Sequence, residues 1–308
     1  MLAITVQTED SRRHPRVPAA DLAALVRRIG APGDTFLVVE RIPDLPDIYI
    51  QVLHRAGEDY TLEYRDGASD RHFQTRIDGP ERVIEAMTGW ARLNDDWDAG
   101  IAWERLDLGT APAAAPVPGL DLGRGEREQL EARVREVIAG GYASRAELAE
   151  LAEEYLVSQD RRPVSPAQAK LLVDRLWLER VGEQARWEGE TDPERVTRAF
   201  SALEAAGITA RENFTCCRNC GQAEIGAEAA PGARGFVYFH QQCTDAAAAG
   251  RGLALLYGGF DGSAQTTVAI GREVVAAAVE AGLLVEWDGT PERAITICAL
   301  DWRRRLVG

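Results

Sequence analysis

Apolar residues recur at helical spacing in two segments of the first hundred residues and gather in short runs between them. Residues 19–29 and 80–93 each follow a proline or begin with one, and both have the three-to-four-residue apolar period of an amphipathic helix. The runs between them are rich in β-branched and aromatic residues, which favours strands at residues 36–40, 49–54, 60–64 and 72–77. The pattern predicts an α+β domain over residues 1–108, in which an antiparallel sheet is flanked by helices. The arginine-rich segment around His14 is expected to be a mobile terminus.

The composition changes to Ala, Pro and Gly over residues 109–125, which we interpret as an interdomain linker. Beyond the linker, helical spacing returns in a middle segment, with predicted helices at residues 126–139, 144–155 and 166–187. A fourth helix opens at Thr191 and is expected to end at Gly207, with Ile208 on its buried side. Short apolar runs then predict strands at residues 236–240, 253–257, 283–287 and 294–300, with a helix at residues 271–281. Residues 126–308 are therefore expected to combine a helical segment with a mixed α+β domain.

The net charge of the chain indicates which kinds of molecule the protein can bind. Among 308 residues, 49 are acidic and 35 are lysine or arginine, which gives a net charge of −14. Such a balance disfavours nucleic acids and anionic membrane surfaces and favours a basic partner. No segment has the length of apolar sequence that crosses a bilayer, and the first residues lack the pattern of a signal peptide, so we expect a cytoplasmic protein. Arginine supplies nearly all the positive charge, which is typical of a GC-rich bacterial genome.

Four of the five cysteines lie close together in the sequence, and their spacing predicts a metal site. Cys217 and Cys220 form one Cys-x2-Cys pair, and His240 and Cys243 form a second pair with the same spacing. Three thiolates and one imidazole would fill the tetrahedral shell of a structural Zn²⁺ in a zinc-knuckle-like loop. Cys216 can replace Cys217 as a ligand, and the sequence does not decide between them.

A redox role for Cys217 and Cys220 requires a helix that begins after a strand, as in thioredoxin-like sites. The residues after Cys220 do not indicate a clear helix. The fifth cysteine, Cys298, lies in a predicted strand and is interpreted as a core residue.

The cysteine region also resembles a known family. The chain is similar to the actinobacterial family of uncharacterised function DUF6891 over about residues 125–305. The resemblance is carried by residues 191–200, 207–208, 213–221, 235–242, 255–258, 282–289 and 300–302. An aspartate is common in that family at the position of Cys243, so this chain departs from the pattern at its fourth expected ligand. The family implies no activity. Residues 17–108 resemble, more weakly, immunity-type domains of bacterial toxin systems.

No nucleophile elbow, Walker loop or dinucleotide-binding fingerprint is present in the sequence. The glycine-rich residues 257–262 lack the lysine and hydroxyl of a phosphate loop and are expected to form a flexible hairpin. The favoured interpretation is a non-catalytic protein-binding module stabilised by zinc, which neutralises a basic partner such as a toxin. The alternative is a zinc-assisted hydrolase that uses Glu224 or a cleft between the domains. The oligomeric state and the identity of the partner are left open.

Overall fold

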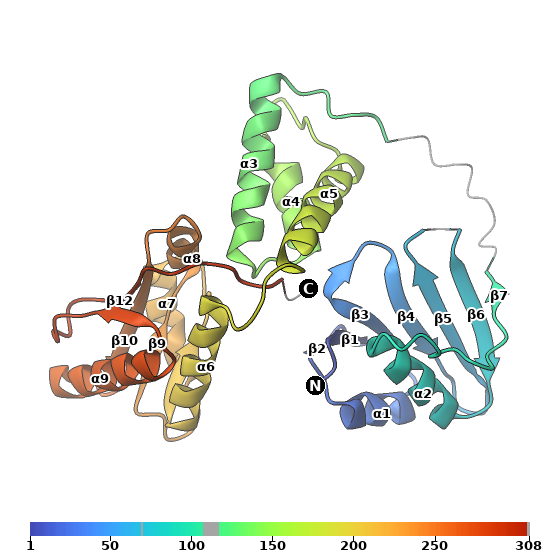
Figure 1. The fold of residues 1–308 in the computed structure, drawn as a ribbon, viewed down its shortest axis with the longest axis horizontal. Helices are drawn as coiled ribbons and strands as arrows, with labels where there is room; N and C mark the ends of the chain where they lie inside the picture. The colour runs from blue at the N-terminus through green and yellow to red at the C-terminus, as the bar shows by residue number, and fades with distance from the viewer. Residues whose placement is uncertain (69, 107–116, 307–308) are drawn as a thin grey trace.

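The computed structural model describes residues 1–68, 70–106 and 117–306, which form two β-sheets and a separate group of helices (Figure 1). The buried apolar side chains in this part of the chain fall into three clusters, one for each sheet and one for the helices. The fold class is α+β, as the sequence predicts. Among the described residues, no helix has both the length and the apolar character needed to cross a membrane.

The N-terminal sheet is antiparallel, and its strand order is β2-β1-β3-β4-β5-β6-β7. Its strands are β1 (Ile4–Thr8), β2 (Arg13–Pro15), β3 (Phe36–Leu45), β4 (Ile48–Leu53), β5 (Tyr60–Asp66), β6 (His72–Ile77) and β7 (Glu104–Arg105). Two helices, α1 (Ala19–Arg28) and α2 (Pro80–Ala91), cover one face of this sheet (Figure 1). The apolar stripes that predict the helices provide the core, since Leu22, Val26 and Met87 are fully buried.

The expectation of a mobile N-terminus is wrong. Ile4 and Val6 on β1 are fully buried, and β1 pairs with β3 on one side and with β2 on the other. His14 lies in β2, opposite Val6. The sheet orders this segment because the alternating residues of β1 place one side of the strand in the core.

The middle helices are α3 (Arg124–Gly140), α4 (Arg145–Glu154) and α5 (Pro166–Gln184), close to the predicted ranges. Ser144 and Ser165 each accept a hydrogen bond from a main-chain N–H in the first turn of the following helix, which fixes where α4 and α5 begin. Residues 109–116 of the expected linker lie outside the described residues. The remaining linker residues, 117–123, lead into α3 without regular structure.

The C-terminal sheet is mixed, with the order β11-β12-β10-β9-β8, and only its β8–β9 pair is parallel among the described strands. Its strands are β8 (Ile208–Arg211), β9 (Gly235–Tyr238), β10 (Leu253–Gly259), β11 (Leu284–Glu286) and β12 (Ile295–Cys298). The helices of this part are α6 (Asp192–Ala205), α7 (Arg218–Glu224), η1 (Ile225–Glu228), α8 (Gln241–Ala248) and α9 (Ala264–Glu280). Helices α6 and α9 pack against each other and against the sheet, while α8 contacts both β10 and α3.

Three sequence-based assignments in this part are wrong. Ile208 belongs to β8 and not to the preceding helix, because Gly207 at φ 79° reverses the chain first. Helix α9 begins at Ala264, well before residue 271, because Ser263 caps it by accepting a hydrogen bond from the main-chain N–H of Thr266. Gly271 is an interior position, where the rings of Tyr257 and Trp287 approach the helix. The glycine-rich residues 257–262 are not a hairpin, because β10 extends to Gly259 and the loop leads into α9.

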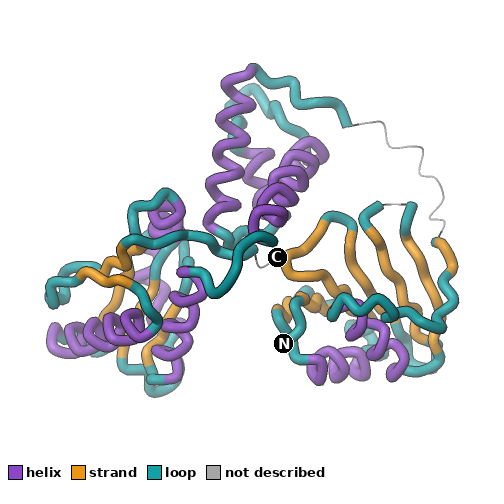
Figure 2. The backbone as a smooth tube through the Cα atoms, viewed as in Figure 1, coloured by secondary structure: helices purple, strands orange, loops and turns teal. Residues whose placement is uncertain are grey.

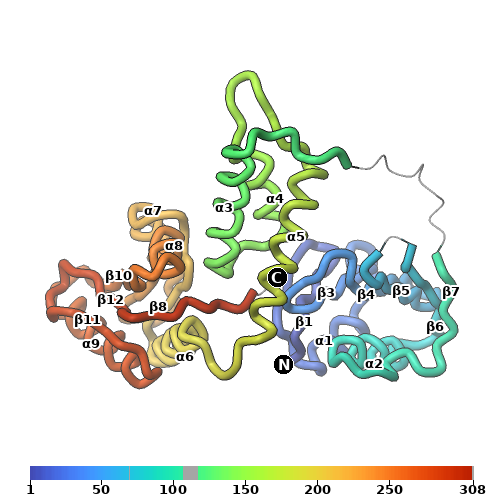
Figure 3. Tube along the Cα trace, turned by 45° about the horizontal axis from the view of Figure 1, so that its top comes forward, coloured from blue at the N-terminus to red at the C-terminus, as the bar shows by residue number. Residues whose placement is uncertain are grey.

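The end of the described chain crosses from the C-terminal sheet to the middle helices (Figures 2 and 3). Trp302 donates a hydrogen bond from Nε1 to the carbonyl oxygen of Gly140, at 3.3 Å. Leu306 is 1% exposed and packs in the same cluster as Leu130 and Trp177. The helical core therefore includes a residue that follows the C-terminal sheet in the sequence.

We expect Leu306→Ala to lower the free energy of unfolding by about 2–5 kcal/mol, because it removes a buried side chain and leaves a cavity. Leu284→Ala is the matched control, since Leu284 is 67% exposed, and it should change stability by less than about 0.5 kcal/mol. Chemical denaturation followed by circular dichroism measures both values. Equal effects of the two substitutions would contradict the assignment of Leu306 to the core.

Candidate metal centre

Three thiols gather at the start of helix α7. The chain leaves β8 through two residues with positive φ, Asn213 at 47° and Thr215 at 60°, and Cys217 then caps α7. One helical turn brings Cys220 back to the same side as Cys217. The Sγ atom of Cys220 lies 3.6 Å from that of Cys216 and 3.7 Å from that of Cys217.

These three sulfurs lie within 4.8 Å of one another, close enough for a single metal ion to bind all of them. Cys216 is exposed, and Cys217 and Cys220 are half-buried. Among the described residues, no other group of three or more histidine, cysteine, aspartate or glutamate side chains has its donor atoms this close together. The cluster can therefore hold a metal ion.

A second pair of metal-binding side chains lies at the start of helix α8. His240 is the N-cap of α8, and Cys243 lies in its first turn. The Cys243 Sγ atom is 3.4 Å from Nε2 and 3.6 Å from Nδ1 of His240, and both residues are 8% exposed. This pair is not part of the group of sulfurs that lie within 4.8 Å of one another.

Main-chain hydrogen bonds bring the two pairs to the same edge of the sheet. The N–H of Phe214 donates to the carbonyl of Phe239 at 2.8 Å, and the N–H of Gln241 donates to the carbonyl of Thr215 at 3.1 Å. These bonds continue the parallel pairing of β8 with β9 beyond the strand ends. Because parallel strands end at the same edge of a sheet, the segments that carry the cysteines and His240 leave that edge side by side.

Tyr238 packs against helix α7. Its ring lies against the main chain of Gly221, so that a Cβ atom at this position would be 2.5 Å from the tyrosine Cε2 atom. Its hydroxyl donates a hydrogen bond to the carbonyl of Arg218 at 3.2 Å. Burial raises the pKa of Tyr238, the positive charge of Arg218 opposes this increase, and the thiols of Cys243 and Cys217 add to it.

The three thiols of the cluster affect one another's charge. Hydrogen bonds from the main chain and the Sγ atom of Cys220 lower the pKa of Cys217. The neighbouring side chains of Cys216 and Cys217 raise the pKa of Cys220 to about 11. A second thiolate is therefore unfavourable next to the first, and a bound cation would remove this repulsion.

His240 and Cys243 are shielded from water, whereas the three thiols of the cluster are exposed or half-buried. Burial raises the pKa of Cys243. Burial, and then the positive charge of Arg218, lower the pKa of His240 and favour the neutral imidazole. The neutral ring is the form that binds metals.

The structure thus gathers Cys216, Cys217 and Cys220 and places His240 beside Cys243. Glu224, the candidate base of a hydrolase, is exposed at the last residue of α7, one turn beyond Cys220. The sequence gives no signal for the contact between Gly221 and Tyr238, because it joins residues on different elements.

Two interpretations of the cysteines need correction. A helix does follow Cys217, so the absence of a helix is not a valid argument against redox chemistry at this pair. Cys298 is half-buried and alternates along β12 with the core residues Ile295 and Ile297, so it lies on the opposite side of the strand from the core.

The fold and the cluster define an α+β protein with a cysteine-rich loop that can bind a metal ion. The profile of the family described as Domain of unknown function (DUF6891) matches residues 124–306, and the chain belongs to this family. The match contains the middle helices, the C-terminal sheet and all five cysteines, and it excludes the N-terminal sheet. No curated protein and no solved structure matches the chain.

Gly221→Ala is expected to destabilise the protein by about 1–3 kcal/mol, because the added methyl group overlaps the ring of Tyr238. Gly226→Ala is the control, since a Cβ atom there meets nothing within 4 Å. It should leave stability unchanged or raise it by up to about 1 kcal/mol. Thermal unfolding of both variants checks this contact, and an unperturbed Gly221→Ala protein would show that the ring is not seated there.

Proposed function

We propose that the protein is a non-catalytic binding module whose cysteine-rich loop is stabilised by a structural Zn²⁺ and whose acidic surface binds a basic protein. The proposed ligands are Cys217, Cys220, His240 and Cys243, with Cys216 as the substitute for Cys217. The separation of the Cys217 and Cys220 Sγ atoms is the observation that supports this assignment.

Zinc–sulfur bonds of about 2.3 Å in a tetrahedral shell separate two sulfurs by about 3.8 Å. The Sγ atoms of Cys217 and Cys220 are 3.7 Å apart. Sγ of Cys243 is nearly equidistant from the two ring nitrogens of His240, at 3.4 Å from Nε2 and 3.6 Å from Nδ1. The Cys217–Cys220 pair therefore has the spacing of two ligands on one ion, whereas His240 and Cys243 would have to reorient to share it.

The number of donors favours a structural ion over a catalytic one. Four protein ligands close a tetrahedral shell, whereas a catalytic zinc keeps one position for water. With Cys216, five donors lie near the edge of the C-terminal sheet, one more than the shell requires. An ion bound there would tie the start of α7 to the start of α8.

The basic partner is inferred from charge. The excess of 14 negative charges attracts cationic surfaces and accelerates their association at low ionic strength. The likeness of residues 17–108 to immunity-type domains points to a cationic toxin as the kind of protein that would be neutralised. This role requires a binding surface and no reaction.

Purified protein is expected to contain one zinc ion per chain by elemental analysis. Cys220→Ser should lose the ion, because Cys220 belongs to both alternative ligand sets. Cys298→Ser is the matched control and should retain it, since Cys298 lies on β12, outside the cluster. Comparison of Cys216→Ser with Cys217→Ser then identifies the ligand. Metal-free wild-type protein would contradict the proposal.

A pull-down from native lysate at low and high salt tests the basic partner. We expect a cationic protein to be retained at low salt and released at high salt, because the Debye length falls from about 30 Å at 0.01 M to about 3 Å at 1 M. A neutral bait protein of similar size controls for non-specific capture. A partner that resists salt, or none, would contradict this part of the proposal.

A further inference from the structure

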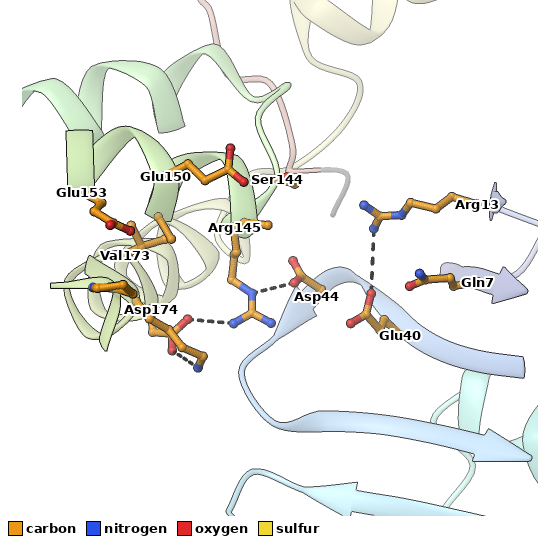
Figure 4. Close-up of a pocket in the computed structure, with 14 residues that line it drawn as sticks. Gln7, Arg13, Glu40, Asp44, Ser144, Arg145, Glu150, Glu153, Val173 and Asp174 are labelled. Atoms are coloured by element: carbon orange, nitrogen blue, oxygen red, sulfur yellow. Dashed lines mark hydrogen bonds and ion pairs between the residues drawn. The ribbon is translucent and has the colours of Figure 1, made fainter. Parts of the chain in front are cut away.

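A cavity of about 570 Å³ lies between the N-terminal sheet and helices α4 and α5 (Figure 4). Glu40 and Asp44 reach it from β3, and Arg145, Glu150 and Glu153 reach it from α4. Its volume is within the range of small-molecule sites. The cavity is separate from the cysteine cluster, and none of the proposed metal ligands lines it.

The two walls of the cavity are held together by specific contacts. Arg145 donates from Nε to Asp44 Oδ2 at 2.6 Å and from the other side of its guanidinium to Asp174 Oδ1 at 2.7 Å. Trp177, which is fully buried, donates from Nε1 to the main-chain oxygen of Asp44 at 2.8 Å. These contacts join β3 to α4 and α5, so the cavity is part of the packed structure.

Several carboxylates at the cavity lack a full complement of partners. Asp44 is 8% exposed, and its Oδ1 atom has no hydrogen-bond partner among the described residues. In the same part of the chain, Glu40 is paired with Arg13 at 3.8 Å, which is beyond hydrogen-bonding distance. Glu150 and Glu153 form no ion pair with any described residue, although each lines the cavity. Figure 4 shows Asp44 between Arg145 and Glu40, with Glu150 and Glu153 on the helical side.

The charges of the lining leave the cavity negative. Five carboxylates line it against the three cations Arg13, Arg145 and Lys170, so the balance is −2. Arg145 and Lys170 are already engaged with Asp174 and Asp44. Burial raises the pKa of Glu40 and the negative charge of Asp44 adds to the increase, while the positive charges of Arg13 and Arg145 oppose it.

The arrangement of these carboxylates disfavours a metal ion. In the part of the chain that the structure describes, only the cysteine cluster brings three or more potential metal ligands within 4.8 Å of one another. The acidic groups of the cavity are instead divided between its two walls. Ala146, Ala149 and Val173 supply apolar lining. A ligand that matches this pattern has separated positive charges joined by methylene groups.

We propose that this cavity binds a small aliphatic polyamine, with one ammonium group near Glu40 and Asp44 and another near Glu150 and Glu153. The methylene chain then lies against the alanines of α4 and Val173 of α5. This site is independent of the zinc loop and of the proposed basic protein partner, because it uses none of the metal ligands and its ligand is a small molecule.

Isothermal titration calorimetry with spermidine tests the site on the full-length protein. We expect spermidine to bind and the monoamine n-butylamine to bind about tenfold or more weakly, because it can reach one wall only. The double variant Glu150→Gln/Glu153→Gln and the single variant Glu40→Gln should each weaken spermidine binding by about tenfold. Both replace carboxylates at exposed or half-exposed positions with side chains of the same shape, and thermal unfolding confirms that the variants are folded.

Glu58→Gln/Glu188→Gln is the matched control, because it removes two exposed carboxylates that lie outside the cavity. It should change spermidine affinity by less than about twofold. Absence of spermidine binding, or an equal loss in the control and the cavity variants, would overturn the site. Pentalysine supplies the same ammonium groups from a peptide, so binding of pentalysine but not spermidine would assign the cavity to a partner's side chains and also overturn the proposal.

Discussion

The parallel pairing of β8 with β9 determines where every proposed metal ligand lies. Two main-chain hydrogen bonds beyond the strand ends, from Phe214 to Phe239 and from Gln241 to Thr215, hold the segments at the same edge of the sheet. Without them, Cys217 and His240 would be separated by a long loop with no fixed geometry. The close packing of Tyr238 on Gly221 then sets the position of α7 on that edge. A bound ion would reinforce an arrangement that the main chain already provides.

The predictions from sequence succeeded where local signals were strong. The apolar stripes of α1 and α2, Ser144 before α4 and Pro166 at the start of α5 predicted these four helices with ends correct to within a few residues. Residues that owe their conformation to distant neighbours were assigned incorrectly. Gly221 and Gly271 disfavour a helix on their own, yet each lies in one, at a position where a closely packed aromatic ring leaves no room for a Cβ atom. The strand β1 was missed for the same reason, since its pairing with β3 is what orders it.

The same distinction applies to the sites. The x2 spacing within each pair of proposed ligands is local, because side chains three residues apart at a helix start face the same way, so both pairs could be identified from sequence. Which of Cys216 and Cys217 binds is not encoded locally, because both Sγ atoms are about equally close to that of Cys220. The cavity between the N-terminal sheet and helices α4 and α5 could not be predicted from the sequence. Its walls are joined by Arg145 and Asp44, which are 101 residues apart, and its carboxylates belong to ordinary amphipathic elements.

The position of Leu306 in the helical core constrains the order in which the protein can assemble during translation. The amide of Leu306 donates a hydrogen bond to the side chain of Gln184, 122 residues earlier. At elongation rates of about 5–20 residues per second, the ribosome needs on the order of ten seconds to synthesise the intervening chain. During that interval the nascent helices present an apolar gap where Leu306 will later insert, which is the kind of surface that a chaperone recognises.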